Sequence, residues 1–381
     1  MSRRTAPPNH IYIDTAPALA RLVAELGRVE RVAIDTEADS LHHYYEKVCL
    51  IQLSFGSASF IVDPLAAIDL GPLLDTLAKR VLIFHGGEYD LRMMLGSFGF
   101  RPRGEVFDTM LAAQLVGSRE LSLVALAENH LGVRLTKQGQ RSDWSARPLK
   151  PEQLAYAVDD TRYLETLAER LTDELRRLGR LEWHRQSCAR MVTFAQQQKP
   201  PAAPERVWRI KGCRELTPRQ LAFVRALWHW REQEAQLADL PPFKVVGNET
   251  LLAVAIAAAA AKSGLGEKVK LPRTCTGRRL AALREAVASV RTMPESEWPR
   301  HLRSIGARVE YGPELDKLRA ECNRIAESLS LDPSLIAPRH TLEVISLRKP
   351  ATLDQVQQAG DLLPWQLELI GPAALRILSG S

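Results

Sequence analysis

The sequence predicts an α/β N-terminal domain, in which a mixed β-sheet is flanked by helices, followed by two small all-α domains. Three observations predict this architecture. Apolar runs of strand length open the chain and then alternate with segments of helical periodicity, the C-terminal region is helical throughout, and a proline-rich stretch lies between the two regions. A chain of 381 residues also exceeds what one hydrophobic core usually organises.

The elements of the first region follow from short apolar runs and from capping residues. Runs of strand length occur at 11–13, 31–36, 48–55, 59–62 and 81–84. Apolar residues recur with helical spacing over 16–26, 70–78 and 89–98. Asp108 and Ser122 are typical N-cap residues and predict helices through 116 and 131. Pro151 predicts the start of one long helix that reaches 175 or beyond.

Proline-containing stretches divide the chain into domains. The segment QQKPPAAPE at 197–205 is typical of a linker, because its prolines and alanines stand between periodic segments. It separates an N-terminal domain at 1–196 from helical domains that we place at 206–293 and 294–381.

The two helical domains resemble each other in sequence. LADLPPFKVVGNETLLAVA at 237–255 and LSLDPSLIAPRHTLEVISL at 329–347 share an apolar–proline–apolar stretch, a polar turn and an apolar helix. We interpret them as two copies of one small domain, of which the second has diverged. Repetition of this kind favours binding over chemistry.

Composition excludes several classes of protein. The N-terminus has no apolar segment typical of a signal peptide, and the longest apolar run, 251–261, is too short to span a bilayer. The five cysteines are scattered without a CxxC pair, which argues against structural zinc and a disulfide framework. We therefore expect a cytoplasmic protein with no membrane partner, and a monomer.

Positive charge is concentrated in the first helical domain. The net charge is +6, and residues 206–291 alone carry 16 basic against 7 acidic side chains. Such a segment favours a polyanionic partner such as nucleic acid. The alternative is a solvated basic face, which charge counting cannot exclude.

The sequence RVAIDTEAD at 31–39 is the first of three acidic stations. An apolar strand runs into Asp35 and Glu37, whose side chains point to the same face because they are two residues apart. Two carboxylates on a rigid strand suit Mg²⁺ or Mn²⁺, which prefer oxygen ligands. The alternative is a strand end with solvated acids.

The second station is HGGEYDLRMML at 85–95, where a strand and a glycine turn lead into a helix. Glu88 and Asp90 both fall in the first helical turn, and spacing does not decide between them. An acid in this position is commonly a partner of the helix dipole.

The third station is YAVDDTRYL at 156–164, within the predicted long helix. Tyr156 and Asp160 are four residues apart and share a helix face, whereas Asp159 lies about 100° around the helix. The pair could be a plain hydrogen-bonded contact. Beside the first station, it could supply another metal ligand and a group that orients water.

Four carboxylates around one point would repel unless cations neutralise them. Two divalent ions ~4 Å apart would do so, and would suit in-line hydrolysis of a phosphodiester. The cofactors expected on this basis are two Mg²⁺ or Mn²⁺ ions.

These residues carry a family resemblance that covers nearly the whole chain. DTEAD, HGGEYD and YAVDD resemble the three motifs of the DEDD exonuclease superfamily, tyrosine subgroup. QGQRSDWSARPL at 138–149 is similar to the segment before the third motif in the bacterial ribonuclease D family, and the two tail copies resemble HRDC domains.

The resemblance implies a ribonuclease-H-like fold and a 3′→5′ exoribonuclease that releases nucleoside 5′-monophosphates, with tRNA precursors and other structured RNAs as substrates. Matched by motif, the implied metal ligands are Asp35, Glu37, Asp90 and Asp160, and Tyr156 would orient the attacking water. Many relatives have an aromatic residue where this chain continues Glu-Ala-Asp. The role of Asp39 therefore stays open, with a solvated side chain as the favoured interpretation.

Substrate contacts are predicted at a second group of residues. Gln52 could meet the terminal nucleotide, and Tyr44 or Tyr45 could stack on a base. Trp144 and Arg147 could grip RNA, or could form a packing corner before a proline.

Two alternative functions follow from the same residues. The first is a DNA 3′→5′ exonuclease of the same chemistry, because carboxylates do not distinguish sugars and discrimination requires contacts to the 2′-hydroxyl. The second is a non-catalytic RNA-binding protein with a decayed nuclease core. Intact motifs favour catalysis over the second alternative.

Overall fold

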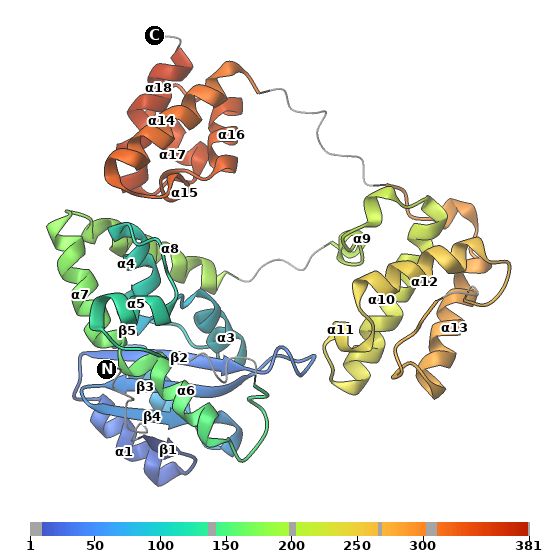
Figure 1. Cartoon of the computed structure of the whole chain (residues 1–381), viewed down its shortest axis with the longest axis horizontal. Helices are drawn as coiled ribbons and strands as arrows, with labels where there is room; N and C mark the ends of the chain where they lie inside the picture. The colour runs from blue at the N-terminus through green and yellow to red at the C-terminus, as the bar shows by residue number, and fades with distance from the viewer. Residues whose placement is uncertain (1–9, 136–141, 198–202, 266–268, 302–310, 380–381) are drawn as a thin grey trace. The chain divides into compact units, whose positions relative to one another are not determined.

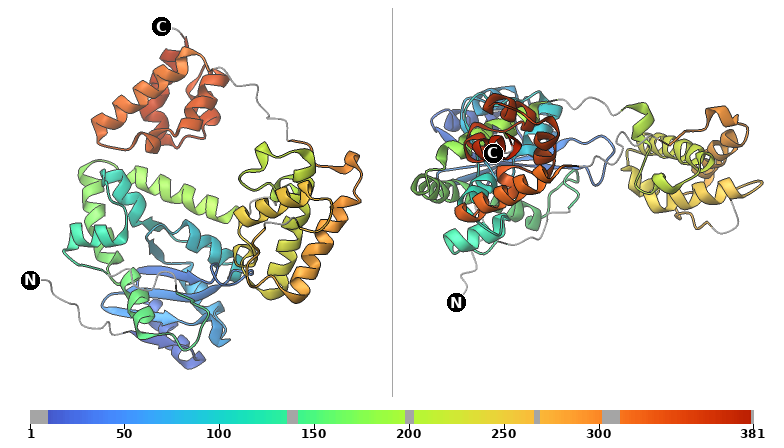
Figure 2. Two further views of the ribbon diagram at one scale, coloured as in Figure 1. Left: turned by 45° about the vertical axis from the view of Figure 1, so that its right-hand side comes forward. Right: turned by 90° about the horizontal axis from the view of Figure 1, so that it is seen from above.

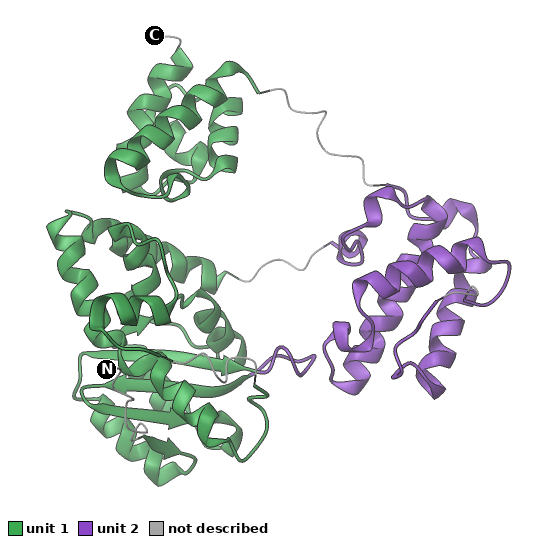
Figure 3. Ribbon diagram, viewed as in Figure 1, with its two compact units in different colours: residues 1–38, 48–197, 308–381 green, residues 39–47, 198–307 purple. Residues whose placement is uncertain are grey.

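The computed structural model describes residues 10–135, 142–197, 203–265, 269–301 and 311–379. Contacts divide the chain into two compact units (Figure 3). The first unit combines residues 1–38, 48–197 and 308–381, and the second combines 39–47 and 198–307. No helix among the described residues has the length and apolar character needed to cross a membrane.

The first unit is built on a six-stranded mixed sheet with the strand order β1-β4-β3-β2-β5-β6 (Figure 1). β2, β3 and β4 form an antiparallel meander, whereas β1 pairs parallel with β4, and β5 and β6 continue parallel from β2. The strands are β1 (Ile11–Ile13), β2 (Arg31–Ala38), β3 (Val48–Phe55), β4 (Ala58–Val62), β5 (Val81–Phe84) and β6 (Val106–Asp108). The predicted mixed sheet is confirmed, and the short edge strand β6 is the strand that the sequence did not indicate.

Helices cover both faces of this sheet (Figures 1 and 2). The helices of the N-terminal part are α1 (Ala16–Leu26), α2 (Gly71–Leu77), α3 (Glu88–Phe98), α4 (Thr109–Val116), α5 (Leu123–Leu131), α6 (Pro151–Arg162), α7 (Leu164–Arg177) and α8 (Leu181–Gln196). Asp108 and Ser122 cap α4 and α5, since their side chains accept hydrogen bonds from the amides of Leu111 (2.9 Å) and Ala125 (3.3 Å). The expected N-caps are thus confirmed.

The prediction of one long helix from Pro151 to 175 or beyond was wrong. The helical segment is interrupted at Tyr163, whose φ of −105° and ψ of −6° separate α6 from α7. α6 packs on β3 and β4 and also contacts β2, whereas α7 packs on β2 and β5. Because neighbouring strands of a sheet are twisted relative to one another, the break lets each helix follow its own part of the sheet.

Side chains along β2 alternate between the two faces of the sheet, so one face packs in the apolar core and the other carries Asp35 and Glu37. Val32 and Ile34 are buried in the core that α1, α2 and α3 complete. Ala33 faces the other side, where it packs with Leu164 and Ala168 of α7. Since side chains alternate along a strand, residues 35 and 37 lie on the same side as Ala33.

The last helical domain belongs to the first unit. It comprises α14 (Pro313–Leu329), α15 (Pro333–Ile336), α16 (Arg339–Arg348), α17 (Leu353–Gly360) and α18 (Pro364–Ser379). Its apolar residues form one continuous core with α4, α5 and α7. Where α4 ends, Gly117 has a φ of +90° and a Cβ there would lie 2.6 Å from the carbonyl oxygen of Ser330, so only glycine fits this approach.

Polar and aromatic contacts fasten this domain to the α/β part. The buried Arg180 donates hydrogen bonds to the carbonyl oxygens of Leu115 (2.7 Å) and Leu329 (2.8 Å), near the C-terminal ends of α4 and α14. The rings of Trp183 and Trp365 stack with their centroids 4.9 Å apart. The diverged second copy is therefore part of the folded core of this unit.

Replacing Trp183 with alanine is expected to lower the free energy of unfolding by about 2–4 kcal/mol, because it removes a large ring from this shared core. Denaturant unfolding of the full chain measures the effect. Phe194→Ala is the matched control: this ring lies on the same helix but is 47% exposed, so its loss should cost less than about 0.5 kcal/mol. Equal losses in the two variants would contradict a docking role for Trp183.

The second unit is helical and contains the first of the two copies. Its helices are α9 (Pro204–Val207), α10 (Pro218–Ala238), α11 (Pro242–Val245), α12 (Asn248–Ala260) and α13 (Gly277–Arg291). α10 is the central helix, and its buried Glu234 accepts two hydrogen bonds from Arg278 at the start of α13 (2.9 and 2.7 Å). Three short 3₁₀ helices complete the described elements of the chain, at Pro64–Ala66, Cys213–Glu215 and Glu295–Glu297.

The two helical domains share the order of elements that the sequence repeat predicts. In each, a long helix ends in a residue with left-handed backbone, namely Asp239 (φ 46°) and Ser330 (φ 54°). A four-residue helix beginning at a proline follows, α11 in one copy and α15 in the other, and then a longer helix. The two domains therefore have the same order of helices over these segments.

Candidate metal centre

Three carboxylates meet at the end of β2. Asp35 and Glu37 project from one face of the strand, and Asp160 approaches the same point from α6. One oxygen atom of each carboxylate lies within 4.8 Å of an oxygen of the other two. The fold thus brings the first and third acidic stations of the sequence together.

Asp90 reaches the same strand from α3 on the opposite side. Its Oδ1 accepts hydrogen bonds from the backbone amide of Thr36 (3.0 Å) and from the Thr36 hydroxyl (2.6 Å). Thr36 stands between the two acids of β2 and points away from them, because side chains alternate along the strand. The second station is therefore fixed to the first by two hydrogen bonds.

The geometry also separates the acids that spacing left ambiguous. Glu88 is exposed at the start of α3, whereas Asp90 is buried. The Oδ1 atom of Asp159 lies 3.4 Å from Nη1 of Arg162 on the same helix, whereas the carboxylate of Asp160 belongs to the cluster with Asp35 and Glu37.

Burial raises the pKa of Asp35, Glu37, Asp90 and Asp160, and a neighbouring carboxylate raises each of them further. The pKa of Asp35 and of Glu37 lies well above the ordinary range, first because burial disfavours the charged form and then because other carboxylates lie near. Burial raises the pKa of Asp90 to about 6, against the opposing hydrogen bonds from Thr36. It raises the pKa of Asp160 to about 7.

The residues present fit divalent metal ions. Mg²⁺ and Mn²⁺ prefer carboxylate oxygens, and the cluster offers several of them on rigid elements. Burial, and then repulsion from neighbouring carboxylates, raises the pKa of Asp35 and Glu37, and bound cations would relieve that repulsion.

Tyr156 lies beside this cluster on α6. Its hydroxyl donates a hydrogen bond to the carboxylate of Asp160, and burial, together with the surrounding negative charge, raises the pKa of the phenol. Its ring packs near that of Trp144, with the centroids 6.1 Å apart. The shared helix face that the sequence predicted for Tyr156 and Asp160 is the geometry found.

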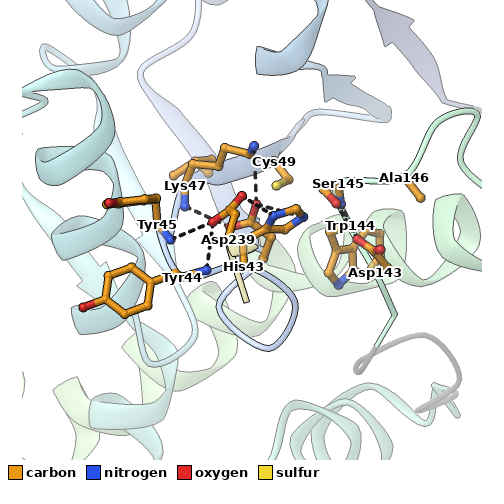
Figure 4. A network of polar contacts seen from close by, with 12 residues as sticks. His43, Tyr44, Tyr45, Lys47, Cys49, Asp143, Trp144, Ser145, Ala146 and Asp239 are labelled. Atoms are coloured by element: carbon orange, nitrogen blue, oxygen red, sulfur yellow. Dashed lines mark hydrogen bonds and ion pairs between the residues drawn. The ribbon is translucent and has the colours of Figure 1, made fainter. Parts of the chain in front are cut away.

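Trp144 and Arg147 occupy a packing corner. Trp144 is 1% exposed. The Arg147 guanidinium donates to the Asp63 carboxylate (2.6 and 2.7 Å) and to the carbonyl oxygen of Cys49 (2.9 Å). Figure 4 shows Trp144 beside Asp143 and Ser145, whose side chains are hydrogen-bonded to each other. These contacts match the packing alternative and leave neither side chain free to grip RNA.

Tyr44 and Tyr45 lie on the loop 39–47, which belongs to the second unit. Their backbone amides both donate to the carboxylate of Asp239 (3.0 and 3.3 Å), as Figure 4 shows. The Tyr44 hydroxyl also donates to Glu232 (3.2 Å), and its ring packs against the apolar core of that unit. Tyr44 therefore has a structural role here, whereas Tyr45 is 62% exposed and stays a prediction for base stacking.

The expectation that Asp39 is a solvated acid was wrong. The residue is fully buried, and its Oδ1 accepts a hydrogen bond from the backbone amide of Lys47 (3.0 Å). Its carbonyl oxygen also accepts from the amides of His42 and His43. The side chain of Asp39 thus joins the first and last residues of the loop 39–47, and this hydrogen bond requires an acceptor at position 39.

Sequence reasoning missed Thr36 and undervalued Asp108. Thr36 donates two hydrogen bonds that fix the position of Asp90. The sequence indicates the direction of this side chain, because a residue between two acids on one face of a strand points to the other face. Asp108 was seen as a helix cap, yet its other carboxylate oxygen also accepts from the amide of Gly87 (2.8 Å), in the turn that leads to α3. No local pattern indicates that second contact.

Comparisons with known proteins agree with this site. Residues 10–176 match the family described as "3'-5' exonuclease", and residues 220–267 match the HRDC domain family. The first match spans all three acidic stations, and the second covers much of the first helical copy.

Curated relatives and solved structures match along nearly the whole chain. Ribonuclease D of Gluconacetobacter diazotrophicus is 32% identical over 98% of this chain and 94% of its own length, and that of Pseudomonas paraeruginosa is 30% identical over 99% of both. The structure of Escherichia coli RNase D, described as an exoribonuclease involved in structured RNA processing, aligns with a TM-score of 0.72 at 28% identity over 98% of this chain and 99% of that one. With the acidic centre and the helical domains in the same order, the chain belongs to the ribonuclease D family of 3′–5′ exonucleases.

Proposed function

We propose that this protein hydrolyses RNA from its 3′ end and releases nucleoside 5′-monophosphates, using two divalent metal ions. The observation that carries the proposal is the cluster of Asp35, Glu37 and Asp160 within 4.8 Å, to which Thr36 holds Asp90. The four carboxylates would be the metal ligands. When bound, the ions supply neutralisation of the phosphate charge and activation of water.

The chain's own residues supply the positioning for this reaction. We assign the orientation of the attacking water to the hydroxyl of Tyr156, because it already makes a hydrogen bond within the carboxylate cluster. The Trp144 ring packs near the Tyr156 ring and restricts its position. Arg147 in turn donates a hydrogen bond to the carbonyl oxygen of Trp144. All of these groups come from one chain, which supports a protein that acts as a monomer.

RNA is the substrate that best accounts for the appended helical domains. We propose tRNA precursors with 3′ extensions and other structured RNAs, a class to which the description of the Escherichia coli relative points. The proposed organisation is an exonuclease domain at 1–196, a linker at 197–205, a first HRDC-like domain at 206–293 and a second, diverged one at 294–381. The repeated order of helices in the two copies supports this assignment.

The decisive experiment follows a 5′-labelled tRNA with a 3′ extension over time, with Mg²⁺, with Mn²⁺ and with EDTA. We expect a metal-dependent ladder that shortens from the 3′ end, and no shortening with the Asp90→Ala protein. A DNA strand degraded as fast as RNA would favour the DNA exonuclease. Tight RNA binding without shortening under either metal would favour the non-catalytic alternative.

The first helical domain should supply phosphate contacts. Many of its arginines are engaged internally, such as Arg291, which donates to the carbonyl oxygens of Ala258 and Ala261. The side chains of Lys211, Arg214 and Arg219 are exposed.

Replacing Lys211, Arg214 and Arg219 together with glutamine should weaken RNA binding and lower the salt slope of log K by about 2, since each phosphate contact contributes ~0.7–0.9. Filter binding at several salt concentrations measures the slope. Matched glutamine replacements in the second copy, at Lys317 and Arg348, should leave it unchanged. If the triple variant kept the salt slope of the unaltered protein, these three side chains would be solvated and would make no phosphate contacts. Substitutions suit this test better than truncation, because the second copy shares a core with the α/β part.

A further inference from the structure

Gln52 in β3 is a buried amide without a partner. The residue is 0% exposed, and both its Oε1 and its Nε2 are buried without a hydrogen bond. Across the described ranges of the chain, no other side chain has two such atoms. Leaving a buried polar group unpaired costs about 1–3 kcal/mol. A side chain of this kind is therefore expected to acquire a partner when the protein is in its working state.

The register of the sheet identifies where the Gln52 side chain faces. Gln52 is directly opposite Asp35 on β2, and residues directly opposite one another in an antiparallel pair present their side chains on the same face. On its other side, Gln52 is opposite the apolar Ile61 of β4. Of these two cross-strand neighbours, only Asp35 can form a hydrogen bond through its side chain.

The neighbours of Gln52 along its own strand offer no competing partner. Leu50, two residues before it on the same face, lies in an apolar cluster with Trp144. Ser54, two residues after it, is already hydrogen-bonded to Ser59 (3.0 Å) and Thr161 (2.7 Å). The amide therefore faces the carboxylate cluster and is shielded from solvent, so it is not placed to meet the terminal nucleotide.

We propose that Gln52 is a positioning residue of the metal centre, whose Nε2 donates a hydrogen bond to the carboxylate of Asp35 when divalent ions are bound. The inference rests on the proposed function. A ligating carboxylate has oxygen lone pairs left over after it binds a cation, and a hydrogen bond to one of them fixes the carboxylate's orientation. Gln52 would thus hold the Asp35 carboxylate in the orientation that binds the ion. In that orientation the carboxylate would accept the hydrogen bond from Gln52 Nε2.

The test compares Gln52→Leu with the unaltered full-length chain. Calorimetric titration of the metal-stripped proteins with Mn²⁺ measures metal affinity, and thermal unfolding in EDTA measures stability without metal. We expect the Mn²⁺ dissociation constant to rise about 10- to 100-fold, the usual effect of removing such a hydrogen bond. The melting temperature in EDTA should stay the same or rise, because leucine removes two unpaired polar atoms.

Activity as a function of Mn²⁺ concentration gives an independent reading of the same effect. At saturating Mn²⁺, the kcat of Gln52→Leu should return to within a few-fold of the unaltered protein, while the Mn²⁺ concentration for half-maximal activity stays raised. A residue that touched the substrate would instead change the KM for RNA at every metal concentration, and that result would overturn the proposal.

Ser54→Ala is the matched control on the same strand and face. It removes hydrogen bonds to Ser59 and Thr161, so its melting temperature in EDTA should fall while its Mn²⁺ dissociation constant stays within twofold. The opposite pattern is expected of Gln52→Leu, so a merely structural role for Gln52 is distinguishable. Should the leucine variant fail to fold, Gln52→Met provides an apolar side chain of similar length.

Two failures can be told apart. If the unaltered protein takes up Mn²⁺ and Gln52→Leu binds it equally well, the role of Gln52 is overturned and the proposed metal centre stands. If the unaltered protein itself takes up no Mn²⁺, the proposed function fails, and the role of Gln52 fails with it.

Discussion

Replacing Asp160 with asparagine is expected to abolish nuclease activity and, at the same time, to raise the stability of the metal-free protein. Activity should fall by at least about 10³-fold, because the charge stabilisation supplied by a metal ion is worth several kcal/mol and each ~1.4 kcal/mol is a factor of ten. Stability should rise because the substitution removes one of several carboxylates that repel each other without cations.

The gain in stability should depend on pH in a defined direction. Folding raises the pKa of Asp160 to about 7, so this group favours the folded state below its unfolded pKa near 4. That contribution is lost as pH rises through about 7. The metal-free protein should therefore become less stable between pH 4 and 8, and Asp160→Asn should flatten that fall.

Thermal unfolding in EDTA across this pH range measures the effect. We expect a gain for Asp160→Asn on the order of 2 kcal/mol at pH 8, allowing for partial contact of the site with solvent. Asp173→Asn is the matched control, because its exposed carboxylate pairs with Arg176 on α7, outside the cluster. Identical pH profiles for Asp160→Asn and the unaltered protein would count against repulsion within the cluster, and addition of Mg²⁺ should reverse the order of stability.

Replacing Tyr156 with phenylalanine should lower kcat by about 10²-fold or more, with little change in RNA or metal affinity. The hydroxyl lies within the carboxylate cluster through its hydrogen bond to Asp160, where it can hold a water in line for attack. Loss of one positioned polar group at the reacting centre typically costs this much. The ring and its packing against Trp144 would remain.

Single-turnover hydrolysis of a 5′-labelled RNA measures this step apart from product release. Tyr163→Phe provides the comparison, since it deletes a tyrosine hydroxyl at the end of the same helix, where the ring lies against Arg162 instead of the cluster. It should stay within about twofold of the unaltered rate. A Tyr156→Phe protein as fast as Tyr163→Phe would remove Tyr156 from the catalytic machinery.

Local rules accounted for much of the fold. The alternation of β2 alone determined that residues 35 and 37 share a face, because side chains on a strand alternate whatever surrounds it. The N-caps of α4 and α5 and the matching helices of the two copies were likewise predictable, since each depends on residues close together in sequence.

Contacts between distant segments decided the rest. Asp90 of α3 is hydrogen-bonded to β2 and Glu88 is exposed, because the packing of α3 on the sheet sets which side of the helix faces the strand. Both acids fall in the same helical turn, so local spacing cannot distinguish them. The same holds for Arg147, whose partners Asp63 and Cys49 are far away in the chain. Asp39, expected in solvent, is buried because Lys47 returns to it across a loop.

The sequence by itself determined the chemical character of this protein: which carboxylates stand on which elements, and in what order. Only the tertiary structure decided which of them meet, that the diverged helical copy completes a core with α4, α5 and α7, and that Gln52 faces Asp35 without a partner. The physical reason is that spacing fixes direction only within one element. Convergence of several elements depends on the packing and the strand register that bring remote residues together.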